Sequence, residues 1–264
     1  MNTSRLSYLL ITFLPLVRSD TWHVSSTSPF PMNYMQTLTM EGLCNNGKQF
    51  ILNSKNQIFI MTNSFDIITQ NLDAIPHSLR EEFQYNHLGD CDYSNAYVYF
   101  PVEEPSYTIP AIFVYKLTDN SIEFVNYKAQ SAQAHMPWIA MDPTTNILYS
   151  SDYYNISTLL MYNTDLEYVG SIKLNSILDE VQGGAFYDGL LYIGVNKGDT
   201  VYAVDITTGD VSIAVTQNDP GSDAEYEFEG LTFLDLRDKG MGLMHNTGNH
   251  HHPAEMTHAL PNDL

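Results

Sequence analysis

Small-residue motifs recur along this chain at a nearly constant interval. The marker residues of the five repeats are Gly42, Gly89, Trp138, Gly184 and Gly230, spaced 47, 49, 46 and 46 residues apart. Short runs of alternating polar and apolar residues lie between them, separated by turn-forming residues. A period in the mid-forties with several strands inside it is typical of one propeller blade. The interval therefore predicts an all-β chain that folds as a five-bladed β-propeller.

The fourth repeat shows the predicted blade most clearly. Asp188-Gly189 is a hairpin signal because these residues tolerate a positive φ. The third repeat follows the same plan, whereas the second has a longer loop at 103–110. In the fourth repeat we expect strands at 184–186, 190–195, 200–205 and 210–215.

The fifth repeat is incomplete, because strands are expected only at 230–233 and 241–245. N-terminal strands at 22–26 and 34–39 would complete the last blade and close the ring without open edges. A six-bladed ring with one degenerate blade is the alternative. Helical signal is weak and is confined to residues 73–83, after Pro76, and to residues 176–181.

The two ends of the chain differ from the repeats. Arg5 followed by an apolar run at 6–17 is typical of a secretory signal peptide, which predicts a signal segment at 1–19 and cleavage after Ser19. The propeller would then span 20–245, and no later stretch is long and apolar enough for a membrane helix. The polar, histidine-containing tail at 246–264 is expected to be disordered. It would bind zinc or copper weakly or have no role.

The charge balance limits the classes of partner. The sequence has 31 acidic and 11 basic residues, a formal net charge of −20. Binding to phosphate backbones or anionic membranes requires clustered lysine and arginine, so neither is expected. We expect a secreted monomer whose acidic surface suits cations, basic partners or simply solubility.

Two cysteines and one sequon bear on the compartment. Cys44 and Cys91 each follow a marker glycine by two residues. They would pair in an oxidising compartment or remain two buried thiols. The sequon at Asn155 is a candidate glycosylation site.

Several segments resemble a family of secreted β-propeller proteins. The stretch from His87 to Tyr93, with 97–103 after it, is similar to the family pattern HIGDIDYYNGYIYVPVE. Further matches lie at 138–142, 181–185 and 229–231, and the resemblance covers about residues 41–245. Cys91 departs from the pattern, which has an aliphatic residue there. The Glu-Gly-Leu steps also resemble calcium-containing lactonase, phytase-like and strictosidine-synthase-like propellers, an analogy of fold alone.

The blade starts carry the candidate site. In a propeller the innermost strands begin at one mouth of the central channel, so polar residues beside the markers should converge. Carboxylates suit a hard cation such as calcium, and Asp90 and Asp92 lie two apart on one strand face. The alternative is a polar, water-filled channel. The predicted metal ligands are Glu41, Asp90, Asp92 and Glu229, and the predicted ligand-binding residues are His87, His135, Trp138 and Gln182.

Two functions follow from these features. The first is a secreted binding module with an acidic channel site, whose ligand would be a small molecule, a carbohydrate or a protein. The second is a calcium-dependent hydrolase of the lactonase or esterase kind. The sequence contains no phosphate-binding glycine loop, no G-x-S-x-G elbow and no H-E-x-x-H motif. We therefore assign no catalytic residue from the sequence.

Overall fold

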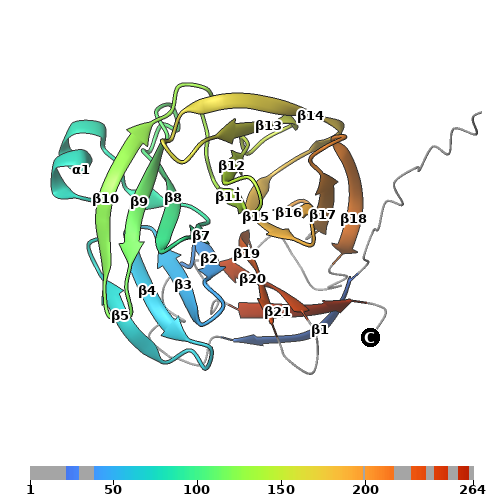
Figure 1. Ribbon diagram of the computed structural model, residues 1–264, viewed down its shortest axis with the longest axis horizontal. Helices are drawn as coiled ribbons and strands as arrows, with labels where there is room; N and C mark the ends of the chain where they lie inside the picture. The colour runs from blue at the N-terminus through green and yellow to red at the C-terminus, as the bar shows by residue number, and fades with distance from the viewer. Residues whose placement is uncertain are drawn as a thin grey trace, which may run out of the picture.

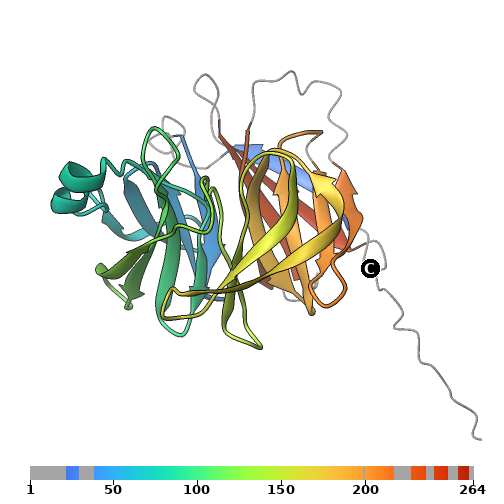
Figure 2. The same ribbon diagram turned by 90° about the horizontal axis from the view of Figure 1, so that it is seen from above.

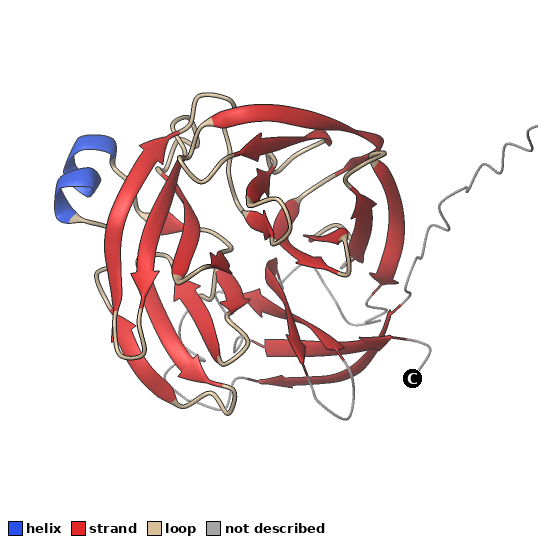
Figure 3. Ribbon diagram, viewed as in Figure 1, coloured by secondary structure: helices blue, strands red, loops and turns tan. Residues whose placement is uncertain are grey.

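The strands of this chain are arranged as sheets around a common axis. A computed structural model describes residues 22–29, 39–198, 200–216, 227–235, 241–248 and 255–261. These residues form five antiparallel sheets and one short helix (Figures 1 and 3). In the view turned by 90°, the sheets stand around the ring and the helix lies on its outer side (Figure 2). The chain is an all-β propeller.

The strands follow one another outward within each sheet. The first sheet contains β2 (Gly42–Asn45), β3 (Gln49–Ser54), β4 (Gln57–Thr62) and β5 (Ile67–Asn71). The second contains β6 (His87–Leu88), β7 (Asp92–Ser94), β8 (Tyr97–Glu103), β9 (Ala111–Leu117) and β10 (Ile122–Ala129). The third contains β11 (Ala140–Asp142), β12 (Ile147–Ser150), β13 (Ile156–Tyr162) and β14 (Tyr168–Leu178). The fourth contains β15 (Val181–Tyr187), β16 (Leu190–Val195), β17 (Thr200–Asp205) and β18 (Asp210–Thr216). The last contains β19 (Glu227–Asp235), β20 (Met241–Gly248), β21 (Glu255–Pro261) and β1 (Trp22–Pro29).

The predicted number of blades is wrong. Four of the sheets are regular four-stranded blades, whereas the second sheet has five strands. The structure therefore has four regular blades, not the five predicted or the six of the alternative. In the second sheet the innermost position is divided between β6 and β7, which both pair with β8.

The division of this inner strand has a local cause. Asp90 leaves β8 and forms a parallel bridge with Trp138 of the neighbouring repeat. The Asp90 N–H donates to the Pro137 carbonyl at 2.9 Å, and the Ile139 N–H donates to the Asp90 carbonyl at 3.2 Å. This close approach requires a glycine before Asp90, because a Cβ at Gly89 would lie 2.1 Å from the Pro137 oxygen. Gly89 is therefore required by the close contact with the neighbouring repeat, and it does not mark the start of a strand.

Both ends of the chain contribute to the last sheet. β1 pairs with β21, β21 with β20, and β20 with β19. The predicted N-terminal strand at 22–26 lies within β1. The predicted strand at 34–39 lies outside the described residues except for Thr39, which is not in a strand. Its place is taken by β21, from the tail that was predicted to be disordered.

A disulfide joins the first two sheets. Cys44 of β2 is bonded to Cys91, which precedes β7, with a Cα–Cα distance of 5.6 Å. Both cysteines are 1% exposed and pack in the apolar cluster between these sheets. The question that the sequence left open is thereby answered in favour of pairing, which is typical of proteins from oxidising compartments.

The sheets pack face to face, so their middle strands are buried on both sides. In β3 and β4 almost every residue is buried, whereas in the outer strand β10 only Ile122 is buried and the other residues are half-buried or exposed. Helix α1 (His77–Phe83) begins after Pro76, as predicted, and buries Leu79. The helix expected at 176–181 is absent, because β14 extends to Leu178 and β15 begins at Val181. No helix in the described ranges is long and apolar enough to cross a membrane.

Candidate functional site

A polar pocket lies where the inner strands of three sheets begin. Its volume is about 290 Å³, and we call it the mouth pocket. Its walls come from the segments before β2 and β6, the β3–β4 turn, the loop after β8 and the start of β19. The lining residues are Thr39, Glu41, Lys55, Asn86, His87, Pro105, Tyr107 and Glu227.

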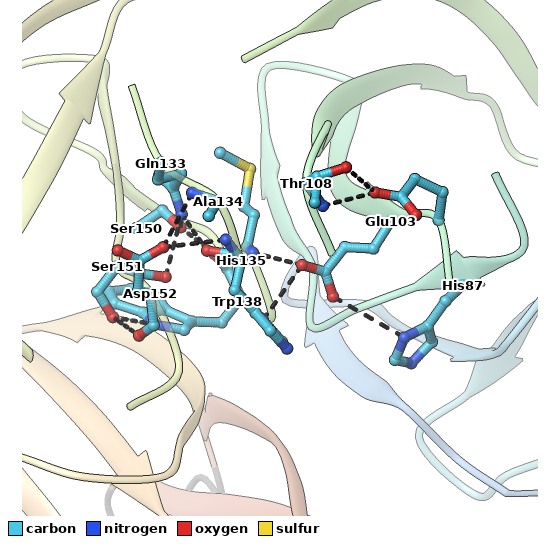
Figure 4. Close-up of polar contacts among 12 residues, drawn as sticks. His87, Glu103, Thr108, Gln133, Ala134, His135, Trp138, Ser150, Ser151 and Asp152 are labelled. Atoms are coloured by element: carbon cyan, nitrogen blue, oxygen red, sulfur yellow. Dashed lines mark hydrogen bonds and ion pairs between the residues drawn. The ribbon is translucent and has the colours of Figure 1, made fainter. Parts of the chain in front are cut away.

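Alternating carboxylates and imidazoles extend inward from this pocket. His87 Nε2 lies 3.0 Å from Glu41 Oε2, at hydrogen-bond distance. On the other side of the ring, His87 Nδ1 lies 3.9 Å from Glu103 Oε2. Glu103 Oε1 lies 3.2 Å from His135 Nδ1 (Figure 4). The four side chains therefore form a continuous chain, Glu41–His87–Glu103–His135, across the first three repeats.

Strand pairing accounts for the position of Glu103. It is the last residue of β8 and lies opposite His87, the first residue of β6. Its side chain is 1% exposed, and Oε1 accepts the Met136 N–H at 2.5 Å. Burial raises the pKa of Glu103 to about 7, although the Met136 N–H and the charge of His87 oppose the shift.

The two imidazoles experience different environments. Burial lowers the pKa of His87, but the hydrogen bond to Glu41 and the charges of Glu41 and Glu103 outweigh it, so the pKa is raised. Burial and the neighbouring His87 lower the pKa of His135 to about 4. His135 is therefore a neutral imidazole at physiological pH, whereas the shift of the His87 pKa favours its charged form.

Aromatic rings and backbone contacts hold His135 in place. Its ring stacks on Tyr107 at a centroid distance of 4.4 Å and on Tyr153 at 5.4 Å. Asp152 Oδ1 accepts the N–H groups of Ala134 and His135 at 3.1 and 3.0 Å (Figure 4). Tyr107 thus forms a wall of the mouth pocket on one side and covers His135 on the other.

The loop that carries Tyr107 is organised by Glu104. This carboxylate accepts the N–H groups of Ser106, Thr108 and Ile109 and the Thr108 hydroxyl. Although burial favours the neutral acid, these donors lower the pKa of Glu104 to about 2. The longer loop noted in the second repeat is therefore a defined structure that positions one wall of the pocket.

Asp90 has a structural position at the centre of the ring. Its side chain is fully buried and accepts three backbone N–H groups from three other sheets. Oδ1 accepts from Leu43 at 2.9 Å, and Oδ2 accepts from Gly184 at 3.1 Å and from Leu231 at 3.3 Å. Burial raises the pKa of Asp90, and the three donors oppose that shift. Its oxygens are thus used to join sheets.

Asp92 is used in a similar way. Its Oδ2 accepts the Met141 N–H from the third sheet at 2.7 Å, and its Oδ1 accepts the Tyr93 N–H at 2.7 Å. Burial raises its pKa to about 7. Asp90 and Asp92 therefore do not face a shared cation position in this structure.

The other predicted residues are distributed around the same region. Glu229 is buried, and burial together with the charges of Glu41 and Glu227 raises its pKa well above the usual range. Trp138 is fully buried in the core and donates its Nε1–H to Ser151 Oγ at 2.9 Å. It is therefore not exposed to a cleft. Gln182 is half-buried in β15.

The described residues contain no group of three or more His, Cys, Asp or Glu side chains placed to hold a metal ion. The predicted calcium ligands Glu41, Asp90, Asp92 and Glu229 thus gain no support from their contacts. Calcium binding stays a prediction.

Sequence reasoning found Glu41, His87 and His135 but missed the residues that connect them. The missed residues are Glu103, Glu104, Tyr107, Asp152 and Glu227. Glu103 could have been located from the antiparallel pairing expected between β6 and β8, which places the end of one strand beside the start of the other.

Comparison with known proteins supports the fold. No protein-family model and no curated protein matches the sequence. The structure is similar to the glutaminyl cyclase of Myxococcus xanthus, with a TM-score of 0.66 and 11% identity, covering 92% of this chain and 98% of that one. It is also similar to the PQQ-bound aldose sugar dehydrogenase of Streptomyces coelicolor, with a TM-score of 0.51 and 9% identity, covering 91% and 98%. At such identities the likeness establishes the propeller fold, which both of these enzymes share.

Proposed function

We propose that this protein is a binding module whose ligand is a small polar molecule held in the mouth pocket. The observation that carries the proposal is the pocket itself, which is lined by the hydrogen-bonded pair Glu41 and His87. Ligand sites in proteins are concave and carry a few convergent polar groups. Shifted pKa values near neutrality cluster at such sites.

The size and charge of the pocket restrict the ligand. A volume of about 290 Å³ admits a molecule of amino-acid or monosaccharide size. Glu41 and Glu227 lie on the wall with a single lysine, Lys55. Together with a net charge of −20, this arrangement favours neutral or cationic ligands over anions.

Filling the pocket tests this function. Asn86 is exposed on the pocket wall, so Asn86→Trp should occupy the pocket without disturbing the core. Saturation-transfer NMR would be measured with glucose, acetate and glycinamide as probes. We expect at least one of them to bind the unmodified protein and to lose binding in Asn86→Trp. A matched control is Asn63→Trp, at an exposed turn between β4 and β5. Absence of binding by all three probes, or equal binding by both variants, would contradict the proposal.

A second candidate is acid–base catalysis at the same pocket. It is favoured by Glu103, whose carboxyl has a pKa of about 7 and lies behind the pocket-lining His87, with Oε2 3.9 Å from His87 Nδ1. A group with such a pKa both accepts and donates protons near neutral pH. The likeness to a glutaminyl cyclase suggests a first substrate, a peptide with an N-terminal glutamine. In cyclisation the α-amine nitrogen bonds to the side-chain amide carbon, and ammonia leaves with one transferred proton. Ammonia release that is lost in Glu103→Gln would support catalysis, and no release at millimolar substrate would count against it.

The calcium-dependent hydrolase is not proposed, because no contact among the described residues supports a calcium site.

We also propose that the protein is secreted. The Cys44–Cys91 disulfide supports this location, and the predicted signal segment at 1–19 lies outside the described residues. The N-terminal sequence of the protein purified from culture medium would test cleavage after Ser19.

A further inference from the structure

Tyr107 presents an aromatic ring on the wall of the mouth pocket. The residue is 43% exposed, so its ring does not serve to fill the core. One face of the ring stacks on the imidazole of His135, with a centroid distance of 4.4 Å and an angle of 13° between the two planes. Because His135 covers one face, the face that a ligand in the pocket can reach is the opposite one.

The backbone of Tyr107 is held in an unfavourable conformation. Its φ is 52°, which is rare for a bulky residue. The Tyr107 N–H donates to the Glu104 carbonyl at 3.0 Å, and the Glu104 carboxylate accepts the N–H groups of Thr108 and Ile109 in the same loop. Such conformations persist where surrounding contacts impose them, and they cluster at ligand sites. The ring is thus fixed before a ligand arrives, which reduces the entropy lost on binding.

Hydrogen-bonding side chains line the same pocket. Lys55, Asn86 and Glu227 are all exposed on its wall. The Lys55 ammonium and the Asn86 amide NH₂ donate, whereas the Asn86 amide oxygen and the Glu227 carboxylate accept. The pocket therefore offers donors and acceptors together, which suits hydroxyl groups because a hydroxyl both donates and accepts.

The charges on the pocket wall balance. Glu41 and Glu227 are acidic, Lys55 is basic, and the raised pKa of His87 favours its charged form. When His87 is charged, two carboxylates face two cations and the wall has no net charge. This balance favours a neutral ligand over an ion of either sign.

A sugar ring combines the required properties. One face of a pyranose carries several C–H groups, whose slight positive charge is attracted to the negative face of an aromatic ring. Its rim carries hydroxyl groups that donate and accept hydrogen bonds. A volume of about 290 Å³ accommodates one such ring. An acyclic polyol has the same hydroxyl groups but no ring face to stack.

We infer that the mouth pocket binds a neutral sugar, one ring of which stacks on the open face of Tyr107 while its hydroxyl groups bond to Lys55, Asn86 and Glu227. The inference rests on the proposed binding function and names the class of its ligand. Glu41 stays paired with His87 and is not required to touch the sugar.

The methyl pyranosides of glucose, galactose and mannose test the inference, with sorbitol as the acyclic control. Titrations followed by saturation-transfer NMR give the dissociation constants. We expect at least one glycoside to bind about 10-fold or more tightly than sorbitol, because only the ring can stack. The C–H hydrogens on one face of the bound ring should receive more saturation than those on the other. Failure of all three glycosides to bind, equal binding of sorbitol, or equal saturation of both faces would overturn the inference.

Tyr107→Ala removes the ring and leaves the polar wall in place. This variant should weaken glycoside binding by about 10-fold or more. Tyr168→Ala is the matched control, because Tyr168 is 48% exposed but lies on the outer strand β14. If Tyr107→Ala fails to fold, the difference in saturation between the two ring faces in the unmodified protein provides the test. Unchanged affinity in folded Tyr107→Ala would contradict stacking on this ring.

The two proposals fail in different ways. If acetate or glycinamide binds and loses binding in Asn86→Trp while no glycoside binds, the sugar inference is wrong and the proposed binding function stands. If none of the probes binds, both fail.

Discussion

The position of Asp90 predicts a specific loss of stability in Asp90→Asn. The carboxylate offers two oxygens to three backbone donors, with Leu43 on one oxygen and Gly184 and Leu231 on the other. An asparagine offers one oxygen and one NH₂ group, which cannot accept. At least one buried N–H must therefore lose its partner.

The size of the expected loss in the free energy of unfolding follows from the number of backbone donors that lose their partner. If the amide oxygen faces Gly184 and Leu231, only the Leu43 N–H is orphaned, at a cost of about 1–3 kcal/mol. The opposite orientation orphans two donors, so the first should prevail. A loss of about 1–3 kcal/mol in a chain of this size lowers Tm by roughly 2–12 °C.

Urea denaturation followed by tryptophan fluorescence measures the loss, and thermal denaturation measures the change in Tm. The exposed Asp66→Asn is the matched control and should stay within about 0.5 kcal/mol of the unmodified protein. Amide hydrogen exchange adds a local readout, because Leu43 should exchange faster in Asp90→Asn while Gly184 stays protected. If the free energies of unfolding of the two variants are equal, the account of Asp90 is wrong.

The Asp90→Asn variant also tests the predicted calcium site. If Asp90 joins sheets through its oxygens, added calcium should leave the Tm of the unmodified protein unchanged. A rise in Tm with calcium that disappears in Asp90→Asn would refute the structural role and return Asp90 to the predicted metal ligands.

Three further predictions concern other contacts. Because the pKa of His135 is about 4 in the folded protein and its ordinary value is 6.5, the unfolded chain binds an extra proton between these values and stability falls as the pH falls from about 6.5 to 4. Urea denaturation of His135→Phe across this range should show a smaller fall, and an unchanged pH profile would contradict the assignment. Removal of the disulfide by the double change Cys44→Ser and Cys91→Ser should cost about 4 kcal/mol, given the separation of 47 residues. A loss below 1 kcal/mol by chemical denaturation would refute it. Glu104→Gln should loosen its loop, with a cost of about 1–3 kcal/mol and faster proteolysis at 105–110, and equal cleavage rates would argue against the carboxylate as its organiser.

The sequence was most informative where one repeat forms one regular sheet. The strands expected at 190–195 and 200–205 coincide with β16 and β17, because alternation and Asp-Gly turns are local signals. The number of regular blades was not a local property. Gly89 stands at its expected place in the sequence repeat, yet Asp90 beside it bonds to Pro137 and bridges to Trp138, which divides the inner strand of the second sheet.

The site was only partly predictable for the same reason. His87 and His135 were found because they stand beside repeat markers. Glu103 was missed because it lies at the far end of β8, and only the antiparallel register brings it to His87. The prediction that Asp90 is a metal ligand considered its charge but not the backbone donors of Leu43, Gly184 and Leu231.

The pairing of β1 with β21 has a consequence for biosynthesis. These strands come from opposite ends of the described chain, yet they are hydrogen-bonded neighbours in one sheet. During synthesis from the N-terminus, β1 emerges before β21, which is the last strand of the described residues. Until β21 has been made, β1 has no strand to pair with, so the last sheet closes only after the other described strands have been synthesised. A chaperone that covers β1, or a truncation that removes β21, would act at this stage.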